Sequence, residues 1–465
     1  MTGASKAIPV VAASCAALAV AIAAAPMSAR ARPPAVAAPP TLAACLKTYR
    51  LPCYSPAQLH AAYHLAPLYR KGLDGKGSTI VIVDPFGSPT IGHDLRMFDR
   101  GFHLPDPPVL RVIQPVGPVP RFNPGNPGMV AKAGETTLDV EWSHAIAPGA
   151  DILLVETPVQ ESVGAGFTSY MAAEDYVIDH DLGDVISQSF SLPEQNFGRA
   201  RIARLRVANV NADRHRVTVL AASNDNGVTG PKPRRGLYVH RVVEWPASDP
   251  LVTAVGGTKL HLDAAGRRTS PNTVWNDTYN PLVTEGIFRA PPPLPWASNG
   301  GVSVIFKRPA YQNTVRRIVG DRRGVPDVSM SAALSGGVIC YATYPGAPPD
   351  GWIPITGGTS EATPEFAGIV AIADQYARTR LHTGRLGLIN PALYALERRH
   401  APGIVDVTRG NNTVAFPSAP GRITTVRGYR ARRGYDLATG VGTIDAARFV
   451  PELARVAAPP RRRPK

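Results

Sequence analysis

Cysteine is scarce in this sequence, and its scarcity excludes some classes of protein. Only four cysteines occur in 465 residues, at positions 15, 45, 53 and 340. Their spacing matches no zinc site, and they are too few for a disulfide-rich scaffold. Cys45 and Cys53 can form a short-loop disulfide in an oxidising compartment. We expect Cys340 to be a buried thiol.

Long apolar runs are also lacking, apart from Ile8–Ala25, which is short for a membrane span. This run has the character of a secretory signal, with cleavage expected after Ala25 or Ala29. We therefore predict a signal peptide over residues 1–29, secretion, and no integral membrane segment after signal removal. An Ala/Pro-rich linker is expected over residues 30–52.

Acidic residues are outnumbered, with 35 Asp and Glu against 50 Lys and Arg, a net charge of +15. Part of this charge lies in Arg461–Lys465, within a basic Pro/Arg tail assigned to residues 454–465. No basic motif is interleaved with aromatic residues, so the sequence predicts no specific nucleic acid partner. The charge indicates loose attraction to anionic surfaces, and a cationic surface-binding protein is one functional alternative.

Short apolar runs alternate with helical patterns along the rest of the chain. The runs are 78–83, 151–155, 185–189, 217–221 and 251–255, and the helical patterns include 56–69, 166–181 and 199–214. Continuous apolar strands of this kind are typical of a parallel sheet that is covered on both faces. We predict one α/β domain over residues 53–453, with a mostly parallel central sheet and helices on both faces.

The stretch Ile353–Arg378, IPITGGTSEATPEFAGIVAIADQYAR, has the strongest functional signal. A short apolar run is followed by Gly357–Gly358, which permits a sharp turn, and Ser360 then opens a helical pattern. Unpaired N–H groups at a helix start favour negative charge, which suits a nucleophile at Ser360. The alternative is a serine or threonine that only caps the helix.

Three acidic residues are candidates for acid–base chemistry. Glu135 and Asp139 stand four residues apart in GETTLDVEWSHAIAPG, so they share one helix face and can share a proton. Asp225 follows the apolar run 217–221, at the end of a strand where sites gather in α/β sheets. An ordinary exposed helix face and an ordinary turn are the respective alternatives.

In this order and spacing, the segments resemble the sedolisin family of serine-carboxyl peptidases, which have a subtilisin-like fold. The resemblance extends over about residues 53–450. The matching motifs are Glu135-x-x-Leu138-Asp139, His144-Ala-Ile-Ala-Pro-Gly149, the loop with Asp225, Trp245–Thr258, Gly300–Phe306, Arg323–Met330 and Gly357-Gly-Thr-Ser360 with Pro364.

The resemblance implies a role for each candidate residue. Ser360 would attack the scissile carbonyl, Glu135 would take its proton, and Asp139 would hydrogen-bond to Glu135 and tune it. A protonated Asp225 would donate a hydrogen bond to the oxyanion. The expected function is a secreted serine-type endopeptidase that cleaves protein or peptide substrates at acidic pH. We expect it to act as a monomer.

A Ser-His-Asp triad of the subtilisin type is the nearest competing mechanism. Asp84 ends the first strand, as the aspartate of such a triad would, but no His-Gly-Thr-His segment follows it. His93 and His144 are the available bases. A helical histidine such as His144 is more often a packing or capping residue.

The C-terminal part of the matching region resembles the calcium-binding segment of the family. The implied ligands are the side chains of Asp406 and Asp436 and the main chain of Val407, Arg432 and Gly434, holding one structural Ca²⁺ ion. Asx-turns are the alternative interpretation of both aspartates.

The sequence also departs from the family. Many members carry a large prosegment, whereas little sequence separates the predicted signal from Cys53, so we expect folding without a covalent prosegment or with help in trans. Ser191, Asn224 and Asn226 stand where smaller residues are usual. These departures raise the alternative of a catalytically silent peptide-binding homologue.

Overall fold

The computed structural model describes residues 37–287 and 294–457. The predicted signal peptide and the tail Arg461–Lys465 lie outside these residues. None of the helices among the described residues is long and apolar enough to cross a bilayer.

The helices occupy the following ranges: α1 Leu42–Tyr49, α2 Pro56–Ala62, α3 Ala66–Tyr69, α4 Ile91–Phe102, α5 Pro127–Ile146, α6 Ala165–Asp179, α7 Glu194–Phe197, α8 Arg199–Leu205, α9 Val207–His215, α10 Arg316–Val319, α11 Thr359–Tyr376, α12 Asn390–Arg398 and α13 Ala446–Ala457. A 3₁₀ segment at Ala310–Val315 and π-helical segments at Leu282–Ile287 and Ala377–Leu381 complete the helical structure of the described residues.

The strands are β1 Cys53–Tyr54, β2 Thr79–Pro85, β3 Leu110–Ile113, β4 Asp151–Thr157, β5 Val185–Gln188, β6 Leu192–Pro193, β7 Thr218–Ala222, β8 Glu244–Trp245, β9 Thr253–Lys259, β10 Thr273–Val274, β11 Gly301–Lys307, β12 Arg322–Val325, β13 Val328–Ser331, β14 Gly337–Tyr341, β15 Trp352–Thr356, β16 Ile404–Val405, β17 Val414–Ala419, β18 Arg422–Val426 and β19 Thr443–Ile444.

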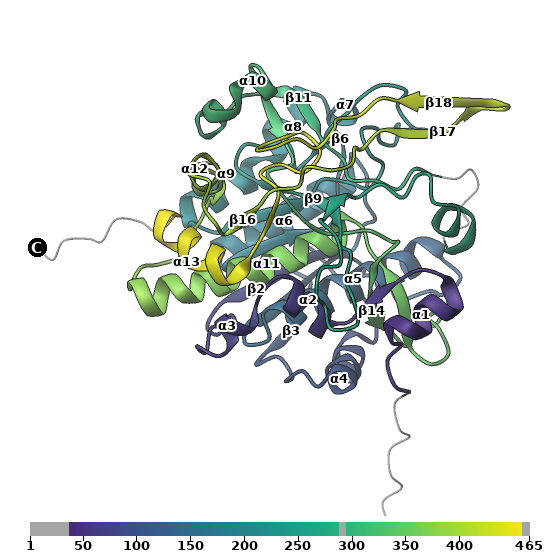
Figure 1. Cartoon of the computed structure of the whole chain (residues 1–465), viewed down its shortest axis with the longest axis vertical. Helices are drawn as coiled ribbons and strands as arrows, with labels where there is room; N and C mark the ends of the chain where they lie inside the picture. The colour runs from purple at the N-terminus through teal and green to yellow at the C-terminus, as the bar shows by residue number, and fades with distance from the viewer. Residues whose placement is uncertain (1–36, 288–293, 458–465) are drawn as a thin grey trace, which may run out of the picture. The chain divides into compact units, whose positions relative to one another are not determined.

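A central sheet of eight strands organises the domain, in the order β10-β9-β7-β5-β2-β4-β3, with β13 also paired to β9. Seven of these strands pair in parallel, and only β10 runs antiparallel to its neighbour β9. The predicted α/β fold with a mostly parallel sheet is therefore confirmed (Figure 1). Its middle strands are buried almost throughout, as their continuous apolar sequences require.

Helices cover both faces of this sheet. Val81 and Val83 of β2 pack in one apolar cluster with Phe167 and Tyr170 of α6. Because successive strand residues alternate between faces, Ile80 and Ile82 face the other side, where α5 and α11 pack against each other and against β2. The carboxyl ends of β2, β5 and β7 thus open beside these two helices.

Two predicted helices are each divided in the structure. The pattern over residues 56–69 forms α2 and α3, separated by His64 with a left-handed φ of 58°. The pattern over 199–214 forms α8 and α9, which meet at Arg206. Apolar periodicity continues across both breaks, so it could not reveal them.

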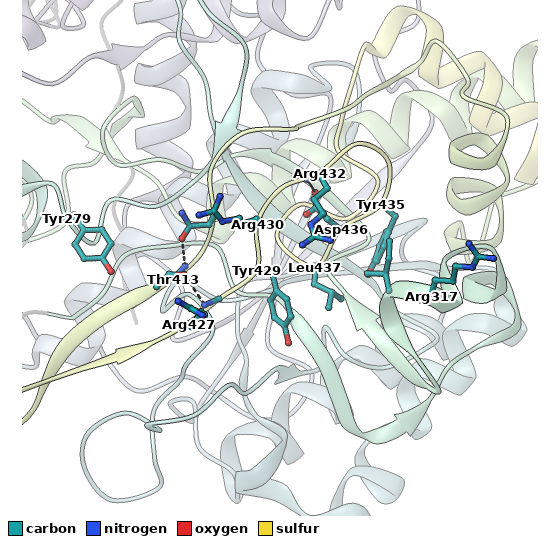
Figure 2. A pocket seen from close by; sticks show the side chains of 13 residues that line it. Tyr279, Arg317, Thr413, Arg427, Tyr429, Arg430, Arg432, Tyr435, Asp436 and Leu437 are labelled. Atoms are coloured by element: carbon teal, nitrogen blue, oxygen red, sulfur yellow. Dashed lines mark hydrogen bonds between the residues drawn. The ribbon is translucent and has the colours of Figure 1, made fainter.

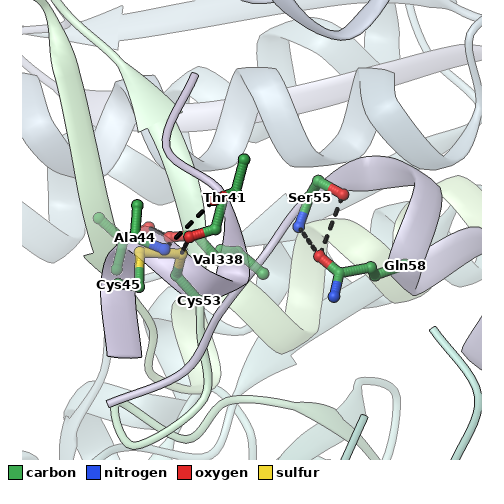
Figure 3. The surroundings of a disulfide bond; sticks show 8 residues. Thr41, Ala44, Cys45, Cys53, Ser55, Gln58 and Val338 are labelled. Carbon is green, nitrogen blue, oxygen red and sulfur yellow. Dashed lines mark hydrogen bonds between the residues drawn. A yellow bond between two sulfur atoms is a disulfide. The ribbon is translucent and has the colours of Figure 1, made fainter. Parts of the chain in front are cut away.

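The predicted linker is partly wrong, because residues 42–49 form helix α1. Thr41 caps this helix by accepting a hydrogen bond from Ala44 N at 3.2 Å. The Cys45–Cys53 disulfide then ties the helix to β1, which pairs with β14 (Figure 3). The predicted disulfide is confirmed, as is the buried free thiol of Cys340.

Candidate active site

Ser360 lies in the first turn of α11, directly after β15. Gly358 precedes the helix with a φ of 109°, which residues with a side chain rarely adopt. Pro364 lies inside α11, where its missing N–H would otherwise have faced the Ser360 carbonyl. The expected helix start at Ser360 is confirmed to within one residue.

Glu135 and Asp139 lie on the neighbouring helix α5, whose first turn is capped by the Asn126 side chain. The two helices approach closely because Gly368 of α11 has no side chain: a Cβ there would lie 2.8 Å from the Cβ of Ile146. This contact brings the acidic face of α5 alongside α11. No hydrogen bond joins Glu135 to Asp139 or to Ser360 within the described residues.

Three carboxyl groups gather at the end of β2: Asp84, Glu135 and Asp139. Burial and then the charge of Glu135 raise the pKa of Asp84 to about 7. Burial and then the charges of Asp84 and Glu135 raise the pKa of Asp139 well above its usual range. Both Asp139 oxygens are buried without a hydrogen-bond partner within the described residues. Asp84 and Asp139 are therefore neutral in acid.

Lys132 lies one turn before Glu135 on α5 and was not singled out in the sequence. Its ammonium is 3.6 Å from Glu161 Oε2. Burial alone would lower the pKa of Lys132, but the negative charges of Glu161, Glu135, Asp84 and Asp139 outweigh it and raise the pKa. A lysine three residues before the first acid is the sequence signal that could have identified this cation.

Asp225 lies beside the start of α11. Its Oδ1 accepts hydrogen bonds from Thr359 N at 2.7 Å and Thr359 Oγ1 at 2.8 Å. Its Oδ2 would lie 2.6 Å from a Cβ at Gly358, so only glycine leaves room for the carboxyl group there. Burial raises the pKa of Asp225 to about 6, although the bonds from Thr359 oppose the shift.

Two of the three departures from smaller residues, Ser191 and Asn224, hydrogen-bond to a common partner. Ser191 Oγ donates to Glu244 Oε2 at 2.6 Å, and Asn224 Nδ2 donates to the same oxygen at 2.7 Å. Asn224 has a φ of 94°, which asparagine tolerates better than most residues. Both side chains are thus held by a buried glutamate.

A second acidic pair on α11, Glu361 and Glu365, was also missed. Both residues are fully buried, and their four carboxyl oxygens have no hydrogen-bond partner within the described residues. Burial raises the pKa of each well above its usual range, and the charge of Glu361 adds to the shift at Glu365. From sequence alone, the spacing does not distinguish this pair from an exposed one.

Neither histidine of the competing triad contacts Ser360. His144 is fully buried, with Nε2 at 2.8 Å from Pro105 O and 3.2 Å from Asp99 Oδ1. His93 is half-exposed and lies 3.1 Å from Asp94 Oδ1. Both rings are engaged elsewhere, which argues against a histidine base.

The expected calcium ligands converge on the turn at residues 432–436. Asp406 Oδ2 accepts from Gly434 N at 2.8 Å, and Asp436 Oδ2 accepts from Arg432 N at 2.8 Å. Within the described residues no group of three or more His, Cys, Asp or Glu side chains suits a metal ion. The side chains of Asp406 and Asp436 both meet this turn, and carboxylate oxygens are ligands that Ca²⁺ prefers.

Comparison with known proteins gives a consistent result. The subtilase family pattern matches residues 128–392. Kumamolisin from Bacillus sp. (strain MN-32) is 32% identical over 412 residues, covering 86% of this chain and 63% of that protein. Human tripeptidyl-peptidase 1 is 27% identical over 327 residues, covering 66% of this chain and 50% of that protein.

A solved structure of Pseudomonas sedolisin, described as a serine-carboxyl proteinase complexed with two molecules of pseudo-iodotyrostatin, has a TM-score of 0.67 to this chain. It is 25% identical and covers 87% of this chain and 99% of that one. The chain spans less than two thirds of the length of the curated relatives it matches, with 63% for kumamolisin and 50% for human tripeptidyl-peptidase 1.

Proposed function

Because the chain belongs to the subtilase family, and within it to the sedolisins, we propose that it hydrolyses peptide bonds at acidic pH with Ser360 as nucleophile. The observation that carries the proposal is the contact between Asp225 and the start of α11. A carboxyl group with a pKa of about 6 lies beside the nucleophile, so in acid it carries a proton that it can donate.

The first step forms an acyl-enzyme. Glu135 takes the proton of Ser360 Oγ, a bond forms between Oγ and the scissile carbonyl carbon, and the carbonyl electron pair moves onto oxygen. Asp225 and the backbone N–H of Ser360 stabilise that oxyanion by donating hydrogen bonds. The C–N bond then breaks, and the leaving amine takes the proton from Glu135. Water completes hydrolysis by the same route.

The surrounding groups have distinct tasks in this scheme. Asp139 is neutral in acid and so has a proton that it would donate to Glu135 during the reaction, which would fix the orientation of the base. Lys132 carries a positive charge one turn away and balances the negative charge of this group of carboxyls. Peptide hydrolysis is confined to acidic pH because Asp225 loses its proton as pH rises through about 6, and it then can no longer donate a hydrogen bond.

The test is hydrolysis of a denatured protein from about pH 3 to 8 by the purified chain, beside Ser360→Ala and Glu135→Gln. We expect activity on the acidic side only, lost in both variants. Activity that peaks near neutrality and survives Glu135→Gln would overturn the mechanism. A folded protein that binds peptide but cleaves none would instead favour the silent peptide-binding homologue.

We infer further that one Ca²⁺ ion is held by Asp406, Asp436 and the main-chain carbonyls of Val407, Arg432 and Gly434. The ion would tie two distant segments together and stabilise the fold. We also infer that the protein is exported under the direction of residues 1–29 and acts as a monomer on protein or peptide substrates. The Cys45–Cys53 disulfide supports an oxidising compartment.

A further inference from the structure

An open pocket of about 830 Å³ lies between the base of the β17–β18 hairpin and α10. Its lining residues are Tyr279, Arg317, Ile318, Asn411, Thr413, Arg427, Gly428, Tyr429, Arg430, Arg432, Tyr435, Asp436 and Leu437. None of the residues proposed for catalysis lines it. Arg432 and Asp436 also belong to the calcium site proposed above, so the pocket adjoins that site, and the peptidase mechanism assigns it no role.

Positive charge dominates this pocket. Arg317, Arg427, Arg430 and Arg432 line it, and no ion pair or hydrogen bond engages their guanidinium groups within the described residues. The one carboxylate of the lining is Asp436, whose Oδ2 accepts from Arg432 N and whose Oδ1 accepts from Ala438 N and Thr439 N. The carboxylate is thus bound to its own turn and leaves the guanidinium groups free for an anion.

The arginines are spread out. In Figure 2 the side chains form a row from Tyr279 past Arg427, Arg430 and Arg432 to Arg317. One compact ion such as inorganic phosphate can contact only part of such a row. An extended chain that carries several anionic groups can engage all of it.

The pocket adjoins the loop that carries Asp225. Gly300 abuts the Leu437 carbonyl so closely that a side chain there has no room, and a Cβ on Gly301 would lie 3.5 Å from the Tyr429 ring. The residues just before these glycines bond to the Asp225 loop: Ala297 N donates to Asp225 O at 2.8 Å, and Asn299 N donates to Asn224 O at 2.9 Å. Residues 297–301 therefore connect the Asp225 loop to Leu437 and Tyr429, which line the pocket.

We propose that this arginine pocket, defined by Arg317, Arg427, Arg430 and Arg432, binds an acidic segment of the substrate polypeptide at a distance from the cleaved bond. The proposal rests on the peptidase function proposed above. It adds a preference for substrates with clustered aspartate or glutamate residues outside the reacting sequence.

Electrostatics and the working pH agree with this class of ligand. Aspartate and glutamate side chains in a flexible substrate ionise at about pH 3.9 to 4.3. Asp225 keeps its proton up to about pH 6. Between these limits the acidic segment is charged while the oxyanion donor is still protonated, so binding and cleavage operate together.

The experiment compares two fluorescent peptides with one cleavable sequence, one extended by an Asp-rich tail and the other by the matched Asn-rich tail. Binding to Ser360→Ala protein is followed by anisotropy at pH 5, and kcat/KM is measured with the active protein. We expect the acidic tail to improve both binding and kcat/KM by about fivefold at low salt. Arg427→Gln/Arg430→Gln should abolish this preference.

The matched control is Arg204→Gln/Arg214→Gln, which removes the same charge from exposed positions on α8 and α9 and should keep the preference. Thermal melting checks that both double variants fold. Equal binding of the two tails, or a preference that survives Arg427→Gln/Arg430→Gln, would overturn the proposal. A third outcome would also overturn the proposal. In it, the acidic tail gives no preference, but a single-stranded oligonucleotide of equal charge displaces the acidic peptide.

Failure of the peptidase function gives a different result. If neither peptide is cleaved, while the acidic tail binds Ser360→Ala protein and the pocket variant abolishes that binding, the pocket stands and the catalytic proposal falls. If both peptides are cleaved at equal rates and bind equally, the catalytic proposal stands and the pocket falls.

Discussion

Helices α5 and α11 pack together, and each carries two acidic residues at i and i+4, yet the two pairs have different surroundings. Glu135 and Asp139 on α5 lie near Asp84 and have the ammonium of Lys132 one turn away. Glu361 and Glu365 on α11 are fully buried.

The groups that face the α11 pair are mostly neutral or acidic. Ser331 of β13 and Tyr63 after α2 lower the pKa of the pair, whereas Asp225 raises that of Glu361. Arg268 is a cation that acts on Tyr63, and there it lowers the pKa of the tyrosine. The i, i+4 spacing thus puts two carboxyl groups on one helix face. A neighbouring cation and access to substrate decide whether one of them can act as a base.

The largest expected effect separates the two pairs directly. Glu135→Gln should lower kcat by about 10³-fold or more, because the base is lost, whereas Glu365→Gln should leave kcat nearly unchanged. Steady-state hydrolysis of one peptide at pH 4 to 5 checks both variants. If Glu365→Gln is as inactive as Glu135→Gln while it still melts cooperatively, the α11 pair takes part in catalysis and the distinction fails.

The next effect concerns the cation that distinguishes the pairs. Lys132→Met should lower kcat/KM about thirtyfold at the acidic end, because Lys132 no longer holds down the pKa values of Asp84 and Asp139 in the same group of carboxyls. The pH–rate profile should show its acidic limb displaced upward, while Lys132→Arg restores it. A uniform loss of rate at every pH, with no displacement, would mean that Lys132 only supports the local fold.

Asp225 interacts electrostatically with both pairs, through Glu135 and Glu361. Asp225→Asn replaces a donor that needs a proton with one that keeps its N–H groups at every pH. We expect activity at pH 4 to fall about tenfold, from imperfect geometry, and the decline near pH 6 to weaken. An unchanged decline near pH 6 would show that another group, such as Asp84, sets that limb.

The smallest effect is on stability. Burial raises the pKa values of Glu361 and Glu365 in the folded protein, so the folded state binds their protons more tightly than the unfolded chain does. Their contribution to the free energy of unfolding is therefore complete below the unfolded pKa of about 4.3 and is lost as pH rises. Relative to the parent protein, Glu361→Gln/Glu365→Gln should therefore raise Tm by a few degrees more at pH 7 than at pH 4.

Calorimetry at both pH values measures this difference against the parent protein. The matched control is a pair of asparagines at exposed acids, Asp213→Asn/Asp321→Asn, which should not change it. If Tm depends on pH in the same way in the parent and in the α11 variant, burial of Glu361 and Glu365 does not set their contribution to stability. Neighbouring groups would then stabilise the pair.

Much of the fold could be predicted because its middle strands are continuous apolar runs. Three strands of this sheet were missed: β3 lies at the sheet edge and is largely exposed, β10 is only two residues long, and β13 is buried but short and half serine. The resemblance identified Glu135, Asp139, Asp225 and Ser360, and the structure brings Asp225 beside Thr359 and Gly358. Their catalytic roles stay predictions.

The Lys132–Glu161 pair and the burial of Glu361 and Glu365 could not be read from the sequence. Lys132 and Glu161 are joined by tertiary packing across α5 and the segment after β4. For Glu361 and Glu365, the same i, i+4 pattern is typical of solvated helices, and only the packing of α11 against α5 and the sheet excludes water.

Gly358 limits how this protein can be varied by substitution. Any side chain there would meet Asp225 Oδ2 at 2.6 Å and would need a backbone angle that only glycine adopts readily. A library that randomises residues around Ser360 to change substrate preference will therefore return glycine at position 358 in nearly every active clone. Useful diversity must come from the strands and loops that surround this turn.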